Sequence, residues 1–179
     1  HLALPSPLPA QYIALDVNEG KMYWTDADTN GIRRANLDGS NVQNLVTGIG
    51  VFGLDLDLDA GKMYWTDPIG FDIQRANLDG SNVETLIPSV PVPQDIVLDP
   101  ENGFMYWANN GTDSIQRARL DGSDIQNVVT GIPSPFGIAI GPATPMPPVP
   151  ALPPAGLVFV VGLVLAATWL LNARGATTS

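Results

Sequence analysis

Apolar and polar residues alternate in short runs throughout residues 12–141, and turn-forming residues separate the runs. Leu54 to Asp59 alternates strictly between aliphatic and acidic residues, and a period of two places one kind of side chain on one face of a β-strand. Glycine-containing turns follow many of the runs, because glycine accepts the positive φ angles that tight turns need. The pattern predicts short strands at 13–16, 21–25, 32–36, 42–46, 54–57, 62–66, 73–77, 83–87, 96–99, 104–107, 115–119, 125–129 and 136–140.

These strands fall into a unit that occurs three times. Each copy has a Tyr-Trp pair on its second strand and Leu-Asp-Gly-Ser roughly 13 residues later, and the pairs begin at Tyr23, Tyr64 and Tyr106. A spacing of about 40–45 residues is typical of a four-stranded propeller blade. The sequence therefore predicts an all-β fold, a partial β-propeller of about three four-stranded blades over residues 12–141, with 136–140 as the first strand of a fourth.

The repeated residues resemble the low-density lipoprotein receptor class B repeat, the Tyr-Trp-Thr-Asp propeller family. Each copy also carries Ile-x-Arg-Ala on its third strand and an aliphatic-Asp pair before its first turn. The resemblance implies a six-bladed propeller used for extracellular binding without catalysis, which needs about 250 residues. The third copy departs from the pattern, because Ala108 and Asn109 replace Thr-Asp. Tyr12 and Asp95 also stand where the family usually has glycine.

Residues that recur in every copy are expected to pack neighbouring sheets together, because a single blade cannot bury its own apolar faces. A ring of aromatic side chains stacking on sugars is the alternative interpretation. The repeated arginines should find carboxylates or carbonyls, and Asp26 and Asp67 are the expected carboxylate partners. The residues assigned this structural role are Tyr23, Trp24, Asp26, Arg34, Tyr64, Trp65, Asp67, Arg75, Tyr106, Trp107 and Arg117.

A specific function should use positions that differ between the copies. In a four-stranded meander, the loops between strands 2 and 3 and between strand 4 and the next strand 1 share one face. Asp28, Phe71, Asp113 and Phe136 lie in these loops and are the candidates for a binding surface. Each of them can also be an ordinary loop residue.

Three acids on one strand face, Asp55, Asp57 and Asp59, suggest calcium ligands, but Asp57 recurs as Asp16 and Asp99. Calcium needs six to eight converging oxygens, so the repeat favours a structural role for these acids. No metal site and no cofactor are predicted.

The net charge of the chain indicates which classes of partner it can bind. The chain has 18 acidic and eight basic residues, a net charge of −10, and all the acids lie between Asp16 and Asp124. Such a surface repels phosphates, which argues against nucleic acid and favours calcium, basic peptides or cationic glycans as partners. The chain has no cysteine and a single histidine, His1, which argues against thiol and histidine-based catalysis within the fold.

The two ends of the chain differ in composition from the repeats. Residues 1–11 are expected to be a linker or the end of a preceding blade, 142–154 a proline-rich spacer, and 172–179 a short tail. Residues 155–171 contain no charge and predict one C-terminal transmembrane helix, with Arg174 on the cytoplasmic side. The segment also resembles bacterial surface-sorting tails, in which a proline motif such as Val149-Pro150-Ala151-Leu152-Pro153 precedes an apolar helix.

The sequence thus predicts an exported, membrane-anchored or surface-sorted binding module, with the repeats outside and no catalytic activity. Its ligand would be a protein, peptide or glycan, and half-propellers could also associate with each other. A propeller hydrolase or lactonase with a carboxylate-bound metal is one alternative. A truncated fragment of a larger propeller protein is the other.

Overall fold

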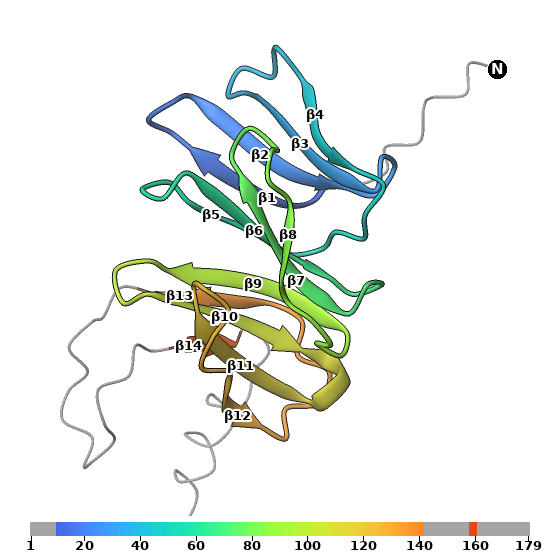
Figure 1. Cartoon of the computed structure of the whole chain (residues 1–179), viewed down its shortest axis with the longest axis vertical. Helices are drawn as coiled ribbons and strands as arrows, with labels where there is room; N and C mark the ends of the chain where they lie inside the picture. The colour runs from blue at the N-terminus through green and yellow to red at the C-terminus, as the bar shows by residue number, and fades with distance from the viewer. Residues whose placement is uncertain (1–9, 142–157, 161–179) are drawn as a thin grey trace, which may run out of the picture.

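The computed structural model describes residues 10–141 and 158–160, which form three four-stranded antiparallel meanders and one strand pair. Figure 1 shows the three sheets side by side, each following the previous one in the chain. The predicted all-β class and the three four-stranded units are confirmed. The first sheet contains β1 (Ala10–Asp16), β2 (Lys21–Asp26), β3 (Gly31–Asn36) and β4 (Gln43–Thr47).

The second and third sheets repeat this order. The second contains β5 (Leu54–Asp57), β6 (Lys62–Asp67), β7 (Asp72–Asn77) and β8 (Glu84–Ile87). The third contains β9 (Pro93–Asp99), β10 (Phe104–Asn109), β11 (Ser114–Arg119) and β12 (Gln126–Thr130), with the short 3₁₀ turn η1 (Asn110–Thr112) between β10 and β11. Most strand ends lie within one or two residues of the predicted ones, but β1 and β9 each begin three residues earlier than expected.

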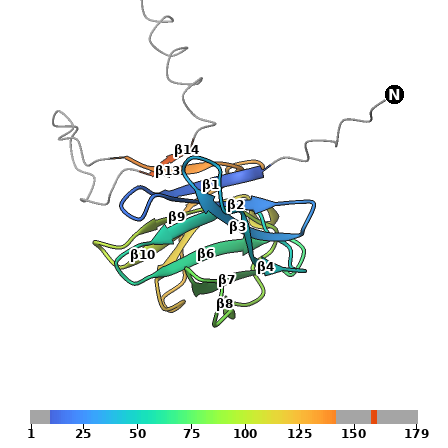
Figure 2. The same cartoon turned by 90° about the horizontal axis from the view of Figure 1, so that it is seen from above.

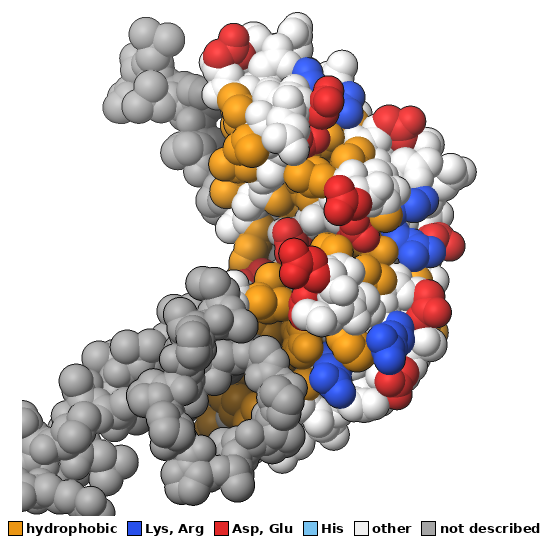
Figure 3. Space-filling model, turned by 90° about the vertical axis from the view of Figure 1, so that its left-hand side faces the viewer, with side chains coloured by type: hydrophobic (Ala, Val, Ile, Leu, Met, Phe, Trp, Pro, Cys, Tyr) orange, Lys and Arg blue, Asp and Glu red, His pale blue; other side chains and the backbone are white. Residues whose placement is uncertain are grey.

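The first strands of the sheets, β1, β5, β9 and then β13 (Ile138–Ile140), are neighbours in that order and line the inner side of the fold. In Figure 2, β1 and β13 lie on one side of the fold and β8 lies on the opposite side. Seen from one end, the described residues form an arc that is hollowed on its inner side (Figure 3). This is the arrangement expected for consecutive blades of a propeller.

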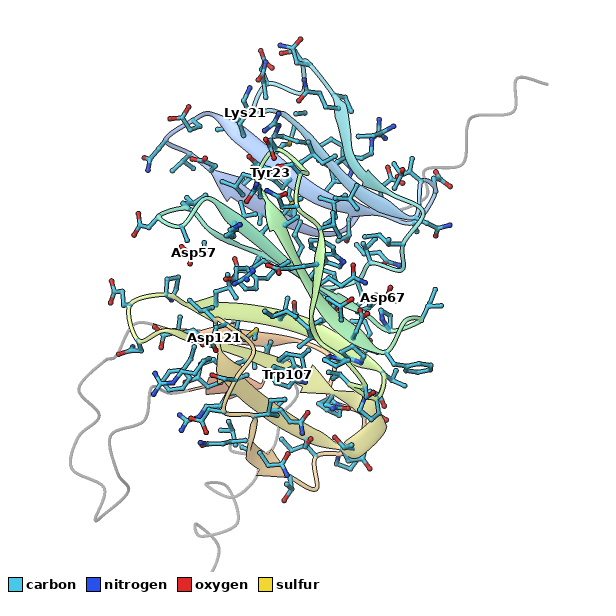
Figure 4. The ribbon with its side chains drawn as sticks, viewed as in Figure 1. Lys21, Tyr23, Asp57, Asp67, Trp107 and Asp121 are labelled. Atoms are coloured by element: carbon cyan, nitrogen blue, oxygen red, sulfur yellow. The ribbon has the colours of Figure 1, made fainter. Side chains whose placement is uncertain are left out.

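The repeated aromatic side chains fill the contacts between sheets, as predicted. Trp65 packs with Tyr23, Ile32 and Val46 of the preceding sheet, and its side chain is fully buried. Trp107 occupies the same place between the second and third sheets, where it packs with Tyr64 (Figure 4). Burying a Trp or Tyr removes about 150–250 Å² from water, so these rings dominate the energetics of each contact. The contacts between blades, rather than sugar stacking, account for the repeated Tyr-Trp pair.

The repeated acids close turns, which supports the structural explanation of Asp57. Its Oδ1 accepts a hydrogen bond of 3.0 Å from the Ala60 amide at the β5–β6 turn. In the Leu-Asp-Gly-Ser turn, Asp79 Oδ1 accepts bonds of 2.9 Å from the Ser81 amide and 2.6 Å from its hydroxyl. These bonds hold the pKa of Asp79 below its usual value. Figure 4 shows Asp57 and Asp121 at one end of the sheets and Asp67 at the opposite end.

The predicted pairing of Asp26 and Asp67 with the repeated arginines is wrong. Asp26 pairs with the neighbouring Arg33 at 3.0 Å, and Asp67 Oδ1 accepts amide hydrogen bonds from Ile69 and Gly70 in its own loop. The side chains alternate along β3, so Arg34 points to the opposite face of the strand from Arg33.

The expectation of carbonyl partners for the repeated arginines is confirmed at two of the three positions. Arg34 donates to the Leu78 carbonyl at 3.2 Å, and Arg75 donates to the Leu120 carbonyl at 3.1 Å. Each carbonyl belongs to the next sheet, so the arginine joins two blades.

The strand β13 pairs with β14 (Val158–Val160), and Ile138 faces Val160 as Ile96 faces Trp107 in the third sheet. These three residues are the only described part of the apolar segment 155–171, and they are extended rather than helical. The remainder of the predicted helix, the spacer 142–154 and the tail 172–179 lie outside the described residues. Within residues 10–141 and 158–160, no helix has the length and apolar character needed to cross a membrane.

Candidate functional site

The loops between strands 2 and 3 and between strand 4 and the next sheet lie on one face, as the meander predicts. In each sheet, an amide of the second loop donates to a carbonyl of the first. The bonds run from Ile49 to Asn30, from Val90 to Phe71 and from Ile132 to Asp113, at 2.7–2.9 Å. We call this surface the loop face.

The three residues whose carbonyls accept these bonds all have left-handed backbone, with φ of 44° at Asn30, 58° at Phe71 and 49° at Asp113. Asn and Asp tolerate this conformation, whereas for a bulky aromatic residue it is strained by about 1–3 kcal/mol. Phe71 nevertheless holds it and leaves 49% of its surface exposed. The adjacent Ile69 is 76% exposed. The loop of the second sheet therefore presents two large apolar side chains to solvent at a cost in stability.

The candidate residues do not form one cluster. Asp28, Phe71 and Asp113 are exposed on the loops of three different sheets, and no hydrogen bond or ion pair within the described part of the chain joins them. Asp113 Oδ1 instead accepts a bond of 3.1 Å from the Ser134 amide, which gives this acid a role in its own loops. The role of all four candidates in binding stays a prediction.

Phe136 lies near the inner strands, in an aromatic group that we call the axial cluster. The ring of Phe52 lies 5.1 Å from that of Tyr12 and 5.2 Å from that of Phe136, with the latter pair edge to face. The three residues come from the starts of the first, second and fourth inner strands, so far-apart parts of the chain meet here. The sequence analysis did not include Tyr12 or Phe52 as site residues, although Tyr12 stands in a place where the family has glycine.

Two carboxylates lie between the inner strands beside this cluster. Asp55 accepts from the Leu98 amide of the next sheet at 2.8 Å, and Asp95 accepts from the Ile138 amide at 3.1 Å. Burial, and then the charge of Asp55, raises the pKa of Asp95 to about 6. Burial also raises the pKa of Asp55, and burial together with the charge of Asp95 raises the pKa of Tyr12 to about 12. These carboxylates join adjacent blades, and Asp95 changes charge in a mildly acidic range.

The acidic side chains of the described residues do not converge on one point. Among residues 10–141 and 158–160, no three histidine, cysteine or acidic side chains come close enough together to hold a metal ion. Asp55 and Asp57, which the sequence placed on one strand face, have backbone amides as partners. What the arrangement does provide is a surface of loops with exposed apolar side chains, next to an aromatic cluster at the inner strands.

Comparisons with known proteins agree with this geometry. The profile of the family described as low-density lipoprotein receptor repeat class B matches residues 20–50, in the first copy, and 103–140, which cover the third copy and the strand after it. The sequence has no significant match among curated proteins. Among solved structures, a chain of a nidogen–laminin complex is similar over 70% of this chain and 50% of its own length, with 25% identity and a TM-score of 0.66.

Two bacterial structures share the fold at lower identity. A TolB homologue from Agrobacterium tumefaciens has 17% identity and a TM-score of 0.54, over 69% of this chain and 50% of that one. Virginiamycin B lyase from Staphylococcus aureus has 19% identity and a TM-score of 0.55, over 71% and 44%. This chain thus spans about half the length of these structures. Its three sheets are arranged as propeller blades, and the first and third match the profile of the Tyr-Trp-Thr-Asp repeat.

Proposed function

We propose that this chain is a non-catalytic binding module that takes a protein ligand on its loop face. The observation that carries the proposal is Phe71, an exposed aromatic side chain held in left-handed backbone beside the exposed Ile69. Aromatic side chains in strained loops are expected at sites where a partner covers them. Phe136 adds a third exposed apolar side chain on the same face.

The net charge of −10 indicates the charge of the proposed ligand. An acidic surface attracts basic partners over roughly 8–10 Å at physiological ionic strength and repels polyanions. The ligand class is therefore a basic protein or peptide with an apolar anchor that contacts Phe71. The complex of nidogen with laminin shows that a chain of similar fold occurs in a protein–protein complex, which supports the class of function.

The sequence of the tail supports a proposal for the location of the module. Residues 155–171 are apolar and uncharged, and Arg174 follows them. We propose that this segment, once released from its pairing with β13, anchors an exported chain, with the repeats on the outer side. Protease added to intact cells should then remove the repeats and leave a tag that follows Ser179 protected; a fully protected chain would contradict this orientation.

Photo-crosslinking in the native host tests the loop face. A benzophenone amino acid in place of Phe71 should give a defined adduct with one protein, and the same group in place of Val83 should not. Val83 is also an exposed apolar residue, but it lies beside the turn between β7 and β8, at the opposite end of the sheet. Equal labelling from both positions, or no adduct from Phe71 or Phe136, would overturn the proposal.

A further inference from the structure

The first blade exposes an apolar face. The equivalent faces of the second and third blades are buried. Ile13 on β1 is 60% exposed, whereas the equivalent Leu54 and Ile96 are 5% and 3% exposed. Trp24 is half-buried, while Trp65 and Trp107 are fully buried. In blades two and three, this face packs on the preceding blade. In blade one, no described residue covers it.

The Leu-Asp-Gly-Ser turn of the first blade is also uncovered. A Cβ atom on Gly80 would lie 2.6 Å from the Leu45 carbonyl oxygen of the preceding blade, and one on Gly122 would lie 2.8 Å from that of Leu86. The equivalent Gly39 has nothing within 4 Å. The carbonyl of Leu37, equivalent to the arginine acceptors Leu78 and Leu120, has no arginine donor within the described residues.

The opposite end of the arc carries the complementary groups. Val129 on β12 is 42% exposed, whereas its equivalents Val46 and Ile87 are 8% and 2% exposed because the next blade covers them. Arg117, equivalent to Arg34 and Arg75, bonds Gln126 but no main-chain carbonyl of a following blade within the part of the chain that the structure describes. The third blade therefore ends in the kind of surface that, at each internal junction, packs against the equivalent of the first blade's open face.

The strand β13 stands at this end in the place of a following blade's first strand. Ile138 packs against Tyr106 and Ile115, and the sequence Ile138-Ala139-Ile140 matches Ile13-Ala14-Leu15 of β1. Among the described residues, the strand β13 forms strand pairs only with the three residues of β14. A second β1 could replace it with the same side-chain chemistry.

We propose that a second copy of this chain docks head to tail, so that the first blade of each copy covers the third blade of the other. Two such junctions close a symmetric ring of six blades, which leaves neither face exposed. In each junction, Ile13 of one copy takes the position that Ile138 holds in the single chain, and β13 is displaced.

The mass of the full-length chain in a mild detergent, measured by size exclusion with light scattering over a range of concentrations and corrected for bound detergent, tests the proposal. The expected mass is twice the chain mass of 18.9 kDa, falling to one chain mass on dilution. Ile13→Asp and Val129→Asp should each raise the dissociation constant about 100-fold or more, because each places a charge in an apolar contact. Ile69→Asp, the same change on the loop face, is the matched control and should leave the mass unchanged.

Two further variants distinguish a head-to-tail ring from other dimers. A mixture of Ile13→Asp and Val129→Asp chains should form a dimer with one intact junction, although neither variant dimerises alone. Ile138→Asp should lower the dissociation constant, since it weakens the strand that β1 displaces. Because Ile13 and Val129 are exposed in the single chain, their substitution should preserve the far-ultraviolet circular dichroism spectrum.

A monomer at every concentration would overturn the proposal and assign the open face to other blades of a longer polypeptide. A dimer insensitive to Val129→Asp would also overturn it, because only the first-blade face would then be in contact. Assemblies that grow with concentration beyond two chains would overturn ring closure.

Discussion

The glycines of the three Leu-Asp-Gly-Ser turns permit a direct measurement of the packing between blades. Gly39, Gly80 and Gly122 have nearly the same backbone, with φ of 81°, 86° and 85°. Replacement by alanine therefore costs about the same backbone strain at each position, on the order of 1–2 kcal/mol. The positions differ in what the new methyl group meets. At Gly80 it would meet the Leu45 carbonyl oxygen at 2.6 Å, while at Gly39 it would meet open space.

The clash at Gly80 cannot be relieved by a side-chain rotation, because the Leu45 carbonyl belongs to the backbone of β4. An ordinary van der Waals contact needs about 3.4 Å or more, so the two blades must separate by most of an ångström. Overpacking of this kind typically costs about 1–3 kcal/mol. Gly80→Ala should therefore lower the free energy of unfolding by about 2–5 kcal/mol in total, and Gly39→Ala by about 1–2 kcal/mol.

Urea denaturation of the full-length chain, at a concentration where it is monomeric, measures both variants against the parent. The m-value should not change, so that the midpoint reports stability alone. Equal losses for Gly39→Ala and Gly80→Ala would refute the assignment of Gly80 to a blade junction. At concentrations where two copies associate, Gly39→Ala should also weaken the dimer, because the second copy would then cover this turn.

Three further predictions use the same comparison of equivalent positions. Trp107→Ala should lower the free energy of unfolding by about 3–5 kcal/mol and Trp24→Ala by clearly less in the monomer, as urea denaturation can check, because Trp107 is fully buried and Trp24 is half-buried. Arg75→Met should cost about 1.5–3 kcal/mol and Arg117→Met less than about 1 kcal/mol, since Arg75 bonds a carbonyl of the next blade and pairs with Glu84, whereas Arg117 does neither among the described residues; equal costs in the same assay would contradict this reason. Asp95 has a pKa of about 6 in the fold against 3.8 as a free group, so its burial disfavours the folded state above pH 6, and its protonation stabilises that state as the pH falls toward 4. Asp95→Asn should therefore gain most relative to the parent at pH 7, by about 1 kcal/mol after allowance for its partial exposure, and less at pH 4; a difference independent of pH in thermal unfolding would show that Asp95 does not titrate in this range.

The fold was predictable because each of the three copies shows the same strand alternation, the same spacing and the same packing residues. Alternation located the strands, and the spacing of the Tyr-Trp pairs gave the size of a blade. Identical residues at identical positions indicated packing between blades, and Trp65 and Trp107 confirm that role. A local turn such as Asp79-Gly80-Ser81 is closed by neighbouring residues, so the sequence contains all the partners that it needs.

Contacts that depend on the direction of a side chain or on distant segments were not predictable in this way. Asp26 was expected to pair with Arg34, but the alternation of side chains on β3 brings Arg33 to it instead. The axial cluster joins Tyr12 to Phe52 and Phe136, from three different loops or strand starts. The sequence singled out two of its members separately: Phe136 as a loop candidate, and Tyr12 at a position where the family that the repeats resemble has glycine. Neither signal identifies the neighbours of these residues.

The departure of the third copy from Tyr-Trp-Thr-Asp has a structural explanation that the sequence alone could not provide. In the second blade, Thr66 Oγ1 accepts from the Gly53 amide at 2.9 Å and donates to the Gln94 carbonyl, so one hydroxyl joins the inner strands of two complete blades. Ala108 has no hydroxyl, and the Asp95 amide bonds the Phe136 carbonyl at 3.3 Å without an intermediary. The threonine is thus replaced at the junction where β13 and β14 are the described strands that follow. At the junction with β13, a direct main-chain bond takes the place of the hydroxyl bridge that joins the second and third blades.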